Sequence, residues 1–365
     1  MKSLYVHIPF CESKCYYCDF CSFKADNHIK NQYISKLLRE IDILPENITL
    51  KSIFIGGGTP SILDIELIIQ IFTKIKTKFK FSENCEITIE CNPNSLTEEK
   101  MQVYNELGIN RISVGVQTLN DNLLKTIGRV HTKQDFINIA KLIPKYFSNY
   151  NFDIMVGLPS QTKEDIENTI KECLSFNPPH ISLYSLILES NTRLEEKVKN
   201  AEIKLPDEDE VTKLYDYARK LLNNAGLKRY EISNFSKHNF ESKHNYHYWQ
   251  SGEYYGVGLS AHSFINGVRY YNTSSMKDYI NGEFKPVYKE ELSIKEQITE
   301  HIMLELRTIY GLNHKNLKNK FNYDILLEKK DELKEISAFV QVDESFIKIK
   351  EESFYISDSI ILKLL

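Results

Sequence analysis

The chain of 365 residues lacks the features of several large protein classes. It has no apolar run near the roughly 18 residues that a membrane-spanning helix needs. Its 46 lysines and arginines face 50 aspartates and glutamates, so the formal net charge is −4 and we expect no nucleic-acid partner. The first residues contain no long apolar stretch before a small-residue cleavage site. The sequence therefore predicts no signal peptide and a cytoplasmic protein.

Cysteine is scarce and unevenly placed. Four of the seven cysteines fall between Cys11 and Cys21, and the other three are scattered. An odd number in a chain without an export signal argues against a disulfide framework and favours metal or redox use. Cys11, Cys15 and Cys18 lie on one short loop and can converge on one soft metal centre. Structural zinc usually takes four ligands, whereas three thiolates on a 4Fe–4S cluster leave one iron open; a zinc loop stays as an alternative.

The first half of the sequence repeats one pattern: a short run rich in Ile and Val, a polar or Gly-rich turn, and a helical stretch. The predicted strands are Leu4–Ile8, Ser52–Ile55, Glu86–Ile89, Arg111–Val116, Phe152–Val156 and His180–Ser185. Such runs are typical of strands that are buried on both faces of a parallel sheet. Six β–α units in series predict an α/β fold, a partial (β/α)6 TIM-like barrel, with an open doubly wound sheet as the alternative.

This rhythm stops near residue 190. The later segments are predicted as a helix at Asp207–Asn224, a strand at Arg229–Phe235, helices at Lys295–Arg307 and Asp324–Phe339, and β-like runs at Phe346–Lys350, Phe354–Ile356 and Asp358–Leu365. A Gly- and aromatic-rich region spans residues 246–264. We predict a barrel over 1–190, an extension of the barrel over 191–288, and a small C-terminal helical, winged-helix-like domain over 289–365.

Polar residues follow one predicted strand after another. Cys11 comes shortly after the first strand, Gly57 and Thr59 after the second, Glu90 after the third and Gln117 after the fourth. The carboxyl ends of parallel strands are where barrels and open α/β sheets build their active sites. Ordinary turns explain the glycines and prolines at these positions, but they do not explain the recurrent polar side chains.

The spacing Cys11-x3-Cys15-x2-Cys18, with the aromatic Tyr17 before the last cysteine, resembles the signature of radical S-adenosylmethionine (SAM) enzymes. The resemblance implies a full or partial (β/α) barrel with a 4Fe–4S cluster at its carboxyl-end mouth. It also implies that the amino and carboxylate groups of SAM chelate the open iron. In that superfamily, an electron from the cluster can cleave SAM to a 5′-deoxyadenosyl radical, and the protein supplies position and seclusion.

Five segments narrow the resemblance to the oxygen-independent coproporphyrinogen III oxidases and their HemW relatives. They are Tyr5–Cys11, Gly56–Ser61, Glu90–Pro93, Ser113–Gln117 and Asp153–Pro159. The resemblance implies that Cys11, Cys15 and Cys18 hold the cluster. The cofactor-binding positions that it implies are Tyr5, Tyr17, Gly57, Gly58, Thr59, Glu90, Gln117, Arg129 and Asp153. The alternatives are salt bridges at the barrel rim for the charged residues, a simple turn for the glycines, and strand packing for Tyr5.

Two features separate the oxidases from HemW. The oxidases have a further cysteine two residues after the last cluster ligand, where this chain has Phe20. Cys21 comes one residue later, so in an extended loop it points to the opposite side, and we interpret it as a non-ligand. The segment His244–Trp249 contains H-N-x-x-Y-W, which is a HemW hallmark.

The HemW resemblance implies a heme chaperone that binds heme and passes it to acceptors such as respiratory cytochromes. A neutral imidazole from His244 is a suitable axial ligand for heme iron, and Tyr248 and Trp249 can pack on the macrocycle. A hydrogen-bonded histidine in an aromatic core is the alternative for His244. The resemblance also implies a homodimer and transient contact with membrane-bound acceptors. The enzyme alternative is an oxygen-independent coproporphyrinogen III oxidase, which decarboxylates two propionate side chains.

Overall fold

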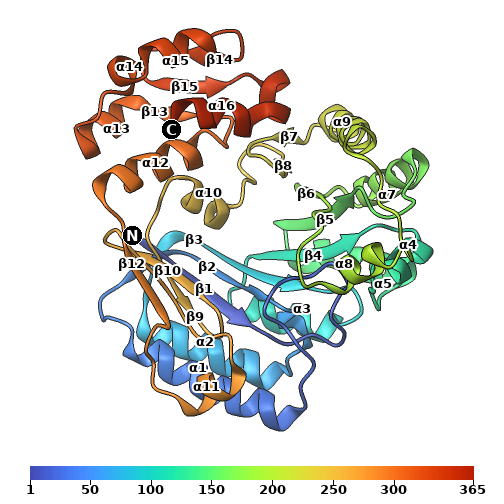
Figure 1. Ribbon diagram of the computed structural model, residues 1–365. Coiled ribbons are helices and arrows are strands. Elements are labelled where there is room, and N and C mark those ends of the chain that lie inside the picture. The colour runs from blue at the N-terminus through green and yellow to red at the C-terminus, as the bar shows by residue number, and fades with distance from the viewer.

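A single curved sheet of twelve strands dominates the computed structural model, which describes all residues 1–365 (Figure 1). The strand order is β12-β11-β10-β9-β1-β2-β3-β4-β5-β6-β8-β7. Strands β1 to β6 are parallel to one another, β9 adds to the free side of β1 in parallel, and β8 pairs with β6 in antiparallel. The two edges, β12 and β7, do not pair with each other. The sheet is therefore a partial barrel, as the sequence predicts.

The six predicted strands are all present, and most extend one to several residues beyond the predicted runs. The strands of the sheet are β1 Lys2–Ile8, β2 Thr49–Gly57, β3 Lys80–Cys91, β4 Arg111–Gln117, β5 Tyr150–Val156, β6 His180–Ser185, β7 Lys228–Arg229, β8 Asn234–Ser236, β9 Tyr254–Val257, β10 His262–Ile265, β11 Val268–Tyr271 and β12 Tyr288–Glu291. Every residue of β4 is buried, as expected for a strand covered on both faces.

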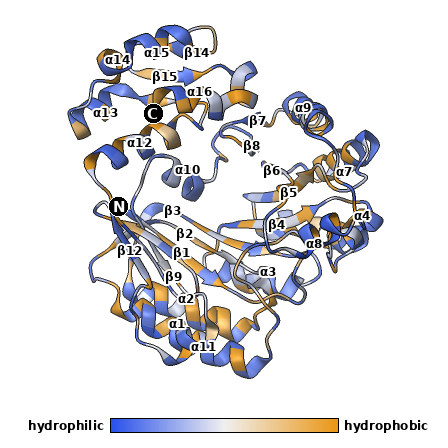
Figure 2. Ribbon diagram, in the orientation of Figure 1, coloured by the Kyte–Doolittle hydropathy of each residue, from blue (hydrophilic) through white to orange (hydrophobic).

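The helices between β1 and β6 connect the parallel strands and cover the outer face of the sheet (Figure 1). They are α1 Asn27–Ile43, α2 Ile65–Lys78, α3 Glu98–Glu106, α4 Asp121–Thr126, α5 Lys133–Ala140, α6 Ile143–Tyr146 and α7 Lys163–Ser175, with a 3-10 helix η1 at Pro60–Ile62. The helices that follow β6 are α8 Arg193–Lys199, α9 Glu208–Asn224, α10 Lys243–Trp249 and α11 Met276–Asn281. Figure 2 shows orange, hydrophobic segments along the central strands, whereas the helices carry both colours. The main core unites 53 buried residues of strands and helices.

Local signals set the helix starts. Thr162 caps α7: its hydroxyl accepts a hydrogen bond from the Asp165 backbone at 3.1 Å, and the Asp165 carboxylate accepts from the Thr162 N–H at 2.8 Å. This capping box satisfies two donors that a helix otherwise leaves unpaired. Thr97 caps α3 in the predicted place.

The C-terminal segment has its own hydrophobic core of 13 buried residues, which include Ile302 and Leu364. Its elements are α12 Ile294–Glu305, β13 Leu312–Asn313, α13 His314–Phe321, α14 Ile325–Glu328, α15 Lys330–Glu335, β14 Val340–Val342, β15 Phe346–Ile349, η2 Glu351–Ile356 and α16 Ser357–Leu364. Three strands pair as an antiparallel sheet in the order β13-β15-β14, next to the helices. This arrangement fits the winged-helix-like expectation. The boundaries at 190/191 and 288/289 stay predictions.

Four predicted elements were wrong. The strand expected at Arg229–Phe235 is a hairpin of β7 and β8, whose turn is held by a hydrogen bond from the Ser233 backbone to the Glu231 carboxylate at 3.2 Å. The helix expected at Asp324–Phe339 breaks between α14 and α15, where Lys329 leaves helical geometry.

The last two β-like runs are helical instead. Phe354–Ile356 lies in the 3-10 helix η2, and Asp358–Leu365 falls almost entirely in α16. The buried positions of α16 include Ile360, Ile361 and Leu364, which share one helix face. Packing of that face against the C-terminal core therefore outweighs the strand preference of isoleucine.

None of the helices in this structure combines the length and the hydrophobicity that a bilayer crossing requires.

Candidate functional site

The three motif cysteines meet at the carboxyl end of the parallel sheet. Cys11, Cys15 and Cys18 all line one cavity of about 410 Å3, and none forms a disulfide. The Thr59 hydroxyl lies 3.6 Å from the Cys11 sulfur, and the Arg129 guanidinium lies 3.5 Å from the Cys15 sulfur. Burial raises the pKa of Cys11, and it raises the pKa of Cys18 to about 11. These two thiols are therefore protonated at neutral pH and must release their protons when they bind a metal.

No group of three Cys, His, Asp or Glu side chains in this structure is arranged to hold a single metal ion. In an iron–sulfur cube each thiolate binds a different iron, whereas a zinc ion gathers its ligands around one centre. The choice between a cluster and a zinc loop stays a prediction from the sequence.

Two carboxylates face the same cavity without an ion pair within 4.0 Å, although the Arg111 guanidinium in the same lining offsets part of their charge. Glu90 is the last residue but one of β3 and accepts a hydrogen bond from the Gly57 backbone at 3.0 Å. Asp153, on β5, accepts from Ser113 at 3.2 Å and from Asn151 at 2.7 Å. Burial raises the pKa of Glu90 to about 8, with Asp153 as the second cause, and burial also raises the pKa of Asp153. A cation in the cavity would stabilise both charges.

Arg129 brings a positive charge into the cavity from the loop after α4. One of its terminal nitrogens donates to Asn92 at 2.8 Å and to the Gly115 carbonyl at 2.6 Å, while the other approaches Cys15. Arg129 has no carboxylate within 4.0 Å, and Glu90 and Asp153 have no Lys, Arg or His nitrogen within the same distance. The rim salt bridges that were the alternative for these residues are therefore absent.

Gln117 and the glycines after β2 have unusual backbones. Gln117 adopts a φ of 64° where β4 shifts its register against β5, and such left-handed residues cluster at functional sites. A Cβ atom on Gly57 would lie 2.6 Å from the imidazole of His7, and one on Gly58 would lie 2.7 Å from the Phe10 carbonyl. We expected these glycines to make room for a ligand. The structure shows that they make room for the chain itself, and the ligand role stays a prediction.

Tyr17 and Tyr5 occupy different places. The Tyr17 ring lines the cavity of the cysteines and packs against a small cluster that includes Leu123 and Met155. Burial raises its pKa, so the phenol stays neutral. Tyr5 lies outside this cavity. Its hydroxyl bonds the His7 ring at 3.0 Å.

A second cavity, of about 750 Å3, lies beside the first. It is lined by Tyr5, His7, Lys14, Asp19, Phe20, Cys21, Phe54, His244, Asn245, Tyr248, Tyr254, Ser260, His262 and Ser274. Phe54, Asn245, Asp19 and Phe20 border both cavities. Cys21 therefore opens into a different space from the motif cysteines, which agrees with its interpretation as a non-ligand.

His244 is buried against the second cavity, and both of its ring nitrogens have partners. Nδ1 lies 2.9 Å from the Ser52 hydroxyl, and Nε2 lies 2.8 Å from the Tyr248 hydroxyl. Burial lowers the pKa of His244 to about 3, so the ring is neutral. The hydrogen-bonded core histidine that the sequence left as an alternative is therefore the geometry found. Trp249 does not line this cavity.

Sequence reasoning missed several residues of the two cavities. His7 follows Tyr5 by two positions, and Asn92 follows Glu90 by two. Because side chains alternate along a strand, each pair faces the same side, and this signal could have identified both. His262, Tyr254 and Phe54 carry no local signal, because the fold brings them together from distant segments.

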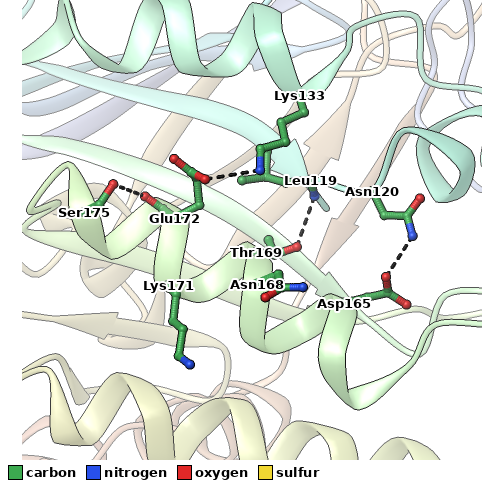
Figure 3. Close-up of a pocket in the computed structure, with 9 residues that line it drawn as sticks. All are labelled: Leu119, Asn120, Lys133, Asp165, Asn168, Thr169, Lys171, Glu172 and Ser175. Carbon is green, nitrogen blue, oxygen red and sulfur yellow. Dashed lines mark hydrogen bonds and ion pairs between the residues drawn. The ribbon is translucent and has the colours of Figure 1, made fainter.

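A polar hollow of about 500 Å3 between α5 and α7 lacks the character of a binding site (Figure 3). Its side chains point at one another: Lys133 pairs with Glu172 at 3.2 Å, and Asn120 donates to Asp165 at 2.8 Å. The Thr169 hydroxyl accepts from a backbone N–H. The polar groups of this hollow therefore pair with one another and stabilise the fold.

Comparisons with known proteins agree with this geometry. Residues 5–173 match the model of the radical SAM superfamily. The heme chaperone HemW of Bacillus subtilis (strain 168) is 38% identical over 330 residues, which cover 88% of this chain and 87% of that protein. HemW of Escherichia coli (strain K12) is 35% identical over 268 residues, 72% of this chain and 70% of that one.

A solved structure shows the same fold. The coproporphyrinogen III oxidase HemN from Escherichia coli, a radical SAM enzyme, superposes with a TM-score of 0.86 over 99% of this chain and 89% of that one, at 22% identity. At this identity the likeness concerns the fold alone. Because the HemW relatives match most of their own length at well over 30% identity, the chain belongs to the HemW family of the radical SAM superfamily.

Proposed function

We propose that this protein is a heme chaperone that carries a 4Fe–4S cluster, binds SAM and delivers heme to acceptor proteins such as respiratory cytochromes. The single observation that carries the proposal is the adjacency of two cavities. One gathers three free thiols, two carboxylates without a close ion pair and two guanidinium groups, and the other is walled by aromatic rings. The HemW names of the relatives support heme as the cargo.

The cluster would be held by Cys11, Cys15 and Cys18. Their thiols are unpaired and line one cavity, and Arg129 lies close enough to offset the negative charge of the Cys15 thiolate. Such a cluster supplies one-electron chemistry at its open iron. The chain itself orients the thiols, because the backbone N–H of Cys18 donates to the Cys15 carbonyl at 3.2 Å and fixes the turn between them.

The other groups of the first cavity fit SAM, which carries an ammonium, a sulfonium and a carboxylate. Glu90 and Asp153 offer carboxylates, and Arg129 offers a guanidinium, and none of the three forms an ion pair within 4.0 Å. Backbone and hydroxyl groups of Gly57, Gly58 and Thr59, together with Gln117, complete the proposed contacts, since all of them line the same space. Both of the ligand's charge signs are thereby matched.

A heme would occupy the second cavity, near His244. The walls include the rings of Tyr5, Phe54, Tyr248 and Tyr254, and the volume lies within the about 300–1,000 Å3 that small-molecule and cofactor sites have. Flat aromatic walls suit a porphyrin, which presents large apolar faces. Dimerisation and contact with membrane-bound acceptors stay expectations from the family.

The competing function is the oxidative decarboxylation of coproporphyrinogen III. Phe20 stands where the oxidases have a cysteine, and this residue is 63% exposed at the border of both cavities. Anaerobic incubation of cluster-loaded protein with coproporphyrinogen III, SAM and a reductant separates the two functions. We expect no vinyl product, and we expect transfer of bound heme to an apo-cytochrome. Formation of the vinyl product would replace the chaperone assignment by the oxidase.

The cluster has a test of its own. Iron and sulfide are measured after anaerobic purification of the wild type, of Cys15→Ser and of the matched control Cys21→Ser. We expect about four irons per chain in the wild type and the control, and a large loss in Cys15→Ser. Zinc in place of iron, or full iron in a variant with all three motif cysteines replaced, would refute the cluster.

A further inference from the structure

The second cavity contains three histidines, and they differ in whether their ring nitrogens are free. His244 uses both nitrogens for the Ser52 and Tyr248 hydroxyls. His7 also uses both: Nδ1 lies 3.0 Å from the Tyr5 hydroxyl, and Nε2 lies 2.9 Å from the Cys21 carbonyl. An imidazole binds iron through a lone pair, so a ring whose nitrogens are both hydrogen-bonded must first break a buried bond.

His262 is the histidine whose ring remains available. It lines the cavity from β10, its side chain is partly exposed, and no hydrogen bond to its ring nitrogens is present. The ring packs against Tyr271 on the neighbouring strand, with centroids 4.7 Å apart and planes tilted by 30°. Burial lowers the pKa of His262, and Arg269 adds to the effect, so the imidazole is neutral at physiological pH and keeps a lone pair.

The segment before His262 holds its backbone in place. A Cβ atom on Gly256 would lie only 2.0 Å from the His262 carbonyl, so glycine allows β9 and β10 to approach this closely. The Ser263 hydroxyl accepts from the Gly256 N–H at 2.8 Å and fixes the same junction. The Gly256–Ser263 stretch contributes no residue to the first cavity, and it presents an imidazole to the second cavity from a strand.

We propose that the imidazole of His262, and not that of His244, coordinates the iron of a heme bound in the second cavity. The inference rests on the proposed function, in which heme is the cargo. His244 is then a positioning residue: its bonds to Ser52 and Tyr248 hold one aromatic wall of the cavity. Its stacking with Phe54, at 5.2 Å between centroids, holds a second wall.

The test uses the full-length protein with ferric heme as the probe, and unbound heme is removed by gel filtration. The absorption spectrum and electron paramagnetic resonance report whether an imidazole binds the iron. We expect His262→Ala to lose this signature and to bind heme at least about tenfold more weakly. Substitution of a residue that only supports a metal ligand already lowers metal affinity about tenfold or more, and substitution of the ligand itself should lower it further. Free imidazole should restore the signature in His262→Gly, which a merely structural role would not allow.

Two variants serve as matched comparisons. His244→Gln keeps an amide in the buried position, and we expect it to weaken heme binding while the imidazole signature remains. Cys21→Ser removes the thiol that lines the same cavity, and we expect its spectrum to match the wild type. Far-ultraviolet circular dichroism confirms that each variant is folded.

The outcomes separate the two proposals. A wild-type chain that binds no heme overturns the proposed function, and the assignment of His262 with it. Heme binding with an unchanged signature in His262→Ala overturns the assignment alone. Loss of the signature in His244→Gln or in Cys21→Ser, with His262→Ala unaffected, transfers the ligand role to that residue.

Discussion

Replacement of Gly57 by alanine tests whether the contact between Gly57, in the first cavity, and His7, in the second, supports both of them. Gly57 has a φ of +112°, and an added Cβ would lie 2.6 Å from two atoms of the His7 ring. His7 in turn bonds Tyr5 and the backbone of Cys21. The Gly57→Ala substitution therefore both strains the backbone and displaces a ring that supports the loop of the cysteines.

Gly226 provides a matched control for the backbone contribution. It has a φ of +83°, but a Cβ there would meet nothing within 4 Å. We expect Gly226→Ala to lower the free energy of unfolding by about 1–2 kcal/mol through the left-handed backbone alone. Gly57→Ala should lose a further ~1–3 kcal/mol, because overpacking adds to the same strain.

Urea unfolding of both variants, with iron analysis after anaerobic purification, measures the difference. We expect Gly57→Ala to be the less stable of the two and to retain less iron, while Gly226→Ala keeps the iron content of the wild type. Equal stability and equal iron in the two variants would refute the role given to the contact between Gly57 and His7.

Three further predictions concern single side chains. Burial raises the pKa of Glu90 from 4.5 to about 8, so the folded state holds a proton that the unfolded state releases, and stability should fall as the pH rises through this window. At about 1.4 kcal/mol per pH unit, the loss in the free energy of unfolding is at most about 5 kcal/mol. Glu90→Gln should therefore flatten the curve of melting temperature against pH in the protein without ligand. Parallel curves for the wild type and the variant would contradict this. Tyr230→Phe removes a buried hydroxyl that bonds His180 at 2.8 Å, and it should lower the free energy of unfolding in urea by about 1–3 kcal/mol; an unchanged midpoint would argue against the bond. Thr162→Ala removes the capping box with Asp165 and should destabilise the protein by about 1 kcal/mol in the same assay; no change would mean that α7 starts independently of its cap.

The barrel strands were predictable because their sequence signal is local. Runs such as Arg111–Val116 are short, apolar and β-branched, and each is followed by polar residues at a strand end. Burial on both faces demands such a composition wherever a parallel strand lies in a core. The first cavity follows from the same logic, because parallel strands bring their carboxyl ends to one edge.

The second cavity was not predictable from local patterns. Its walls come from β1, β2, α10, β9 and β10, and the pairing of β9 with β1 joins residues about 250 positions apart. Tyr254–Val257 is only four residues long and lacks a clear alternation. The wrong prediction of a strand at Asp358–Leu365 has a related cause. Isoleucine by itself favours a strand, whereas packing of one face of α16 against the C-terminal core stabilises a helix.

The pairing of β9 with β1 also governs the order in which the molecule can be completed during translation. The cysteine loop leaves the ribosome among the first residues, but β1 keeps one row of backbone groups without a partner until β9 has been made. An unpaired strand edge invites contact with other chains, and pairings this distant form slowly. The cavity proposed for heme therefore cannot be complete before β9 and β10 have been made.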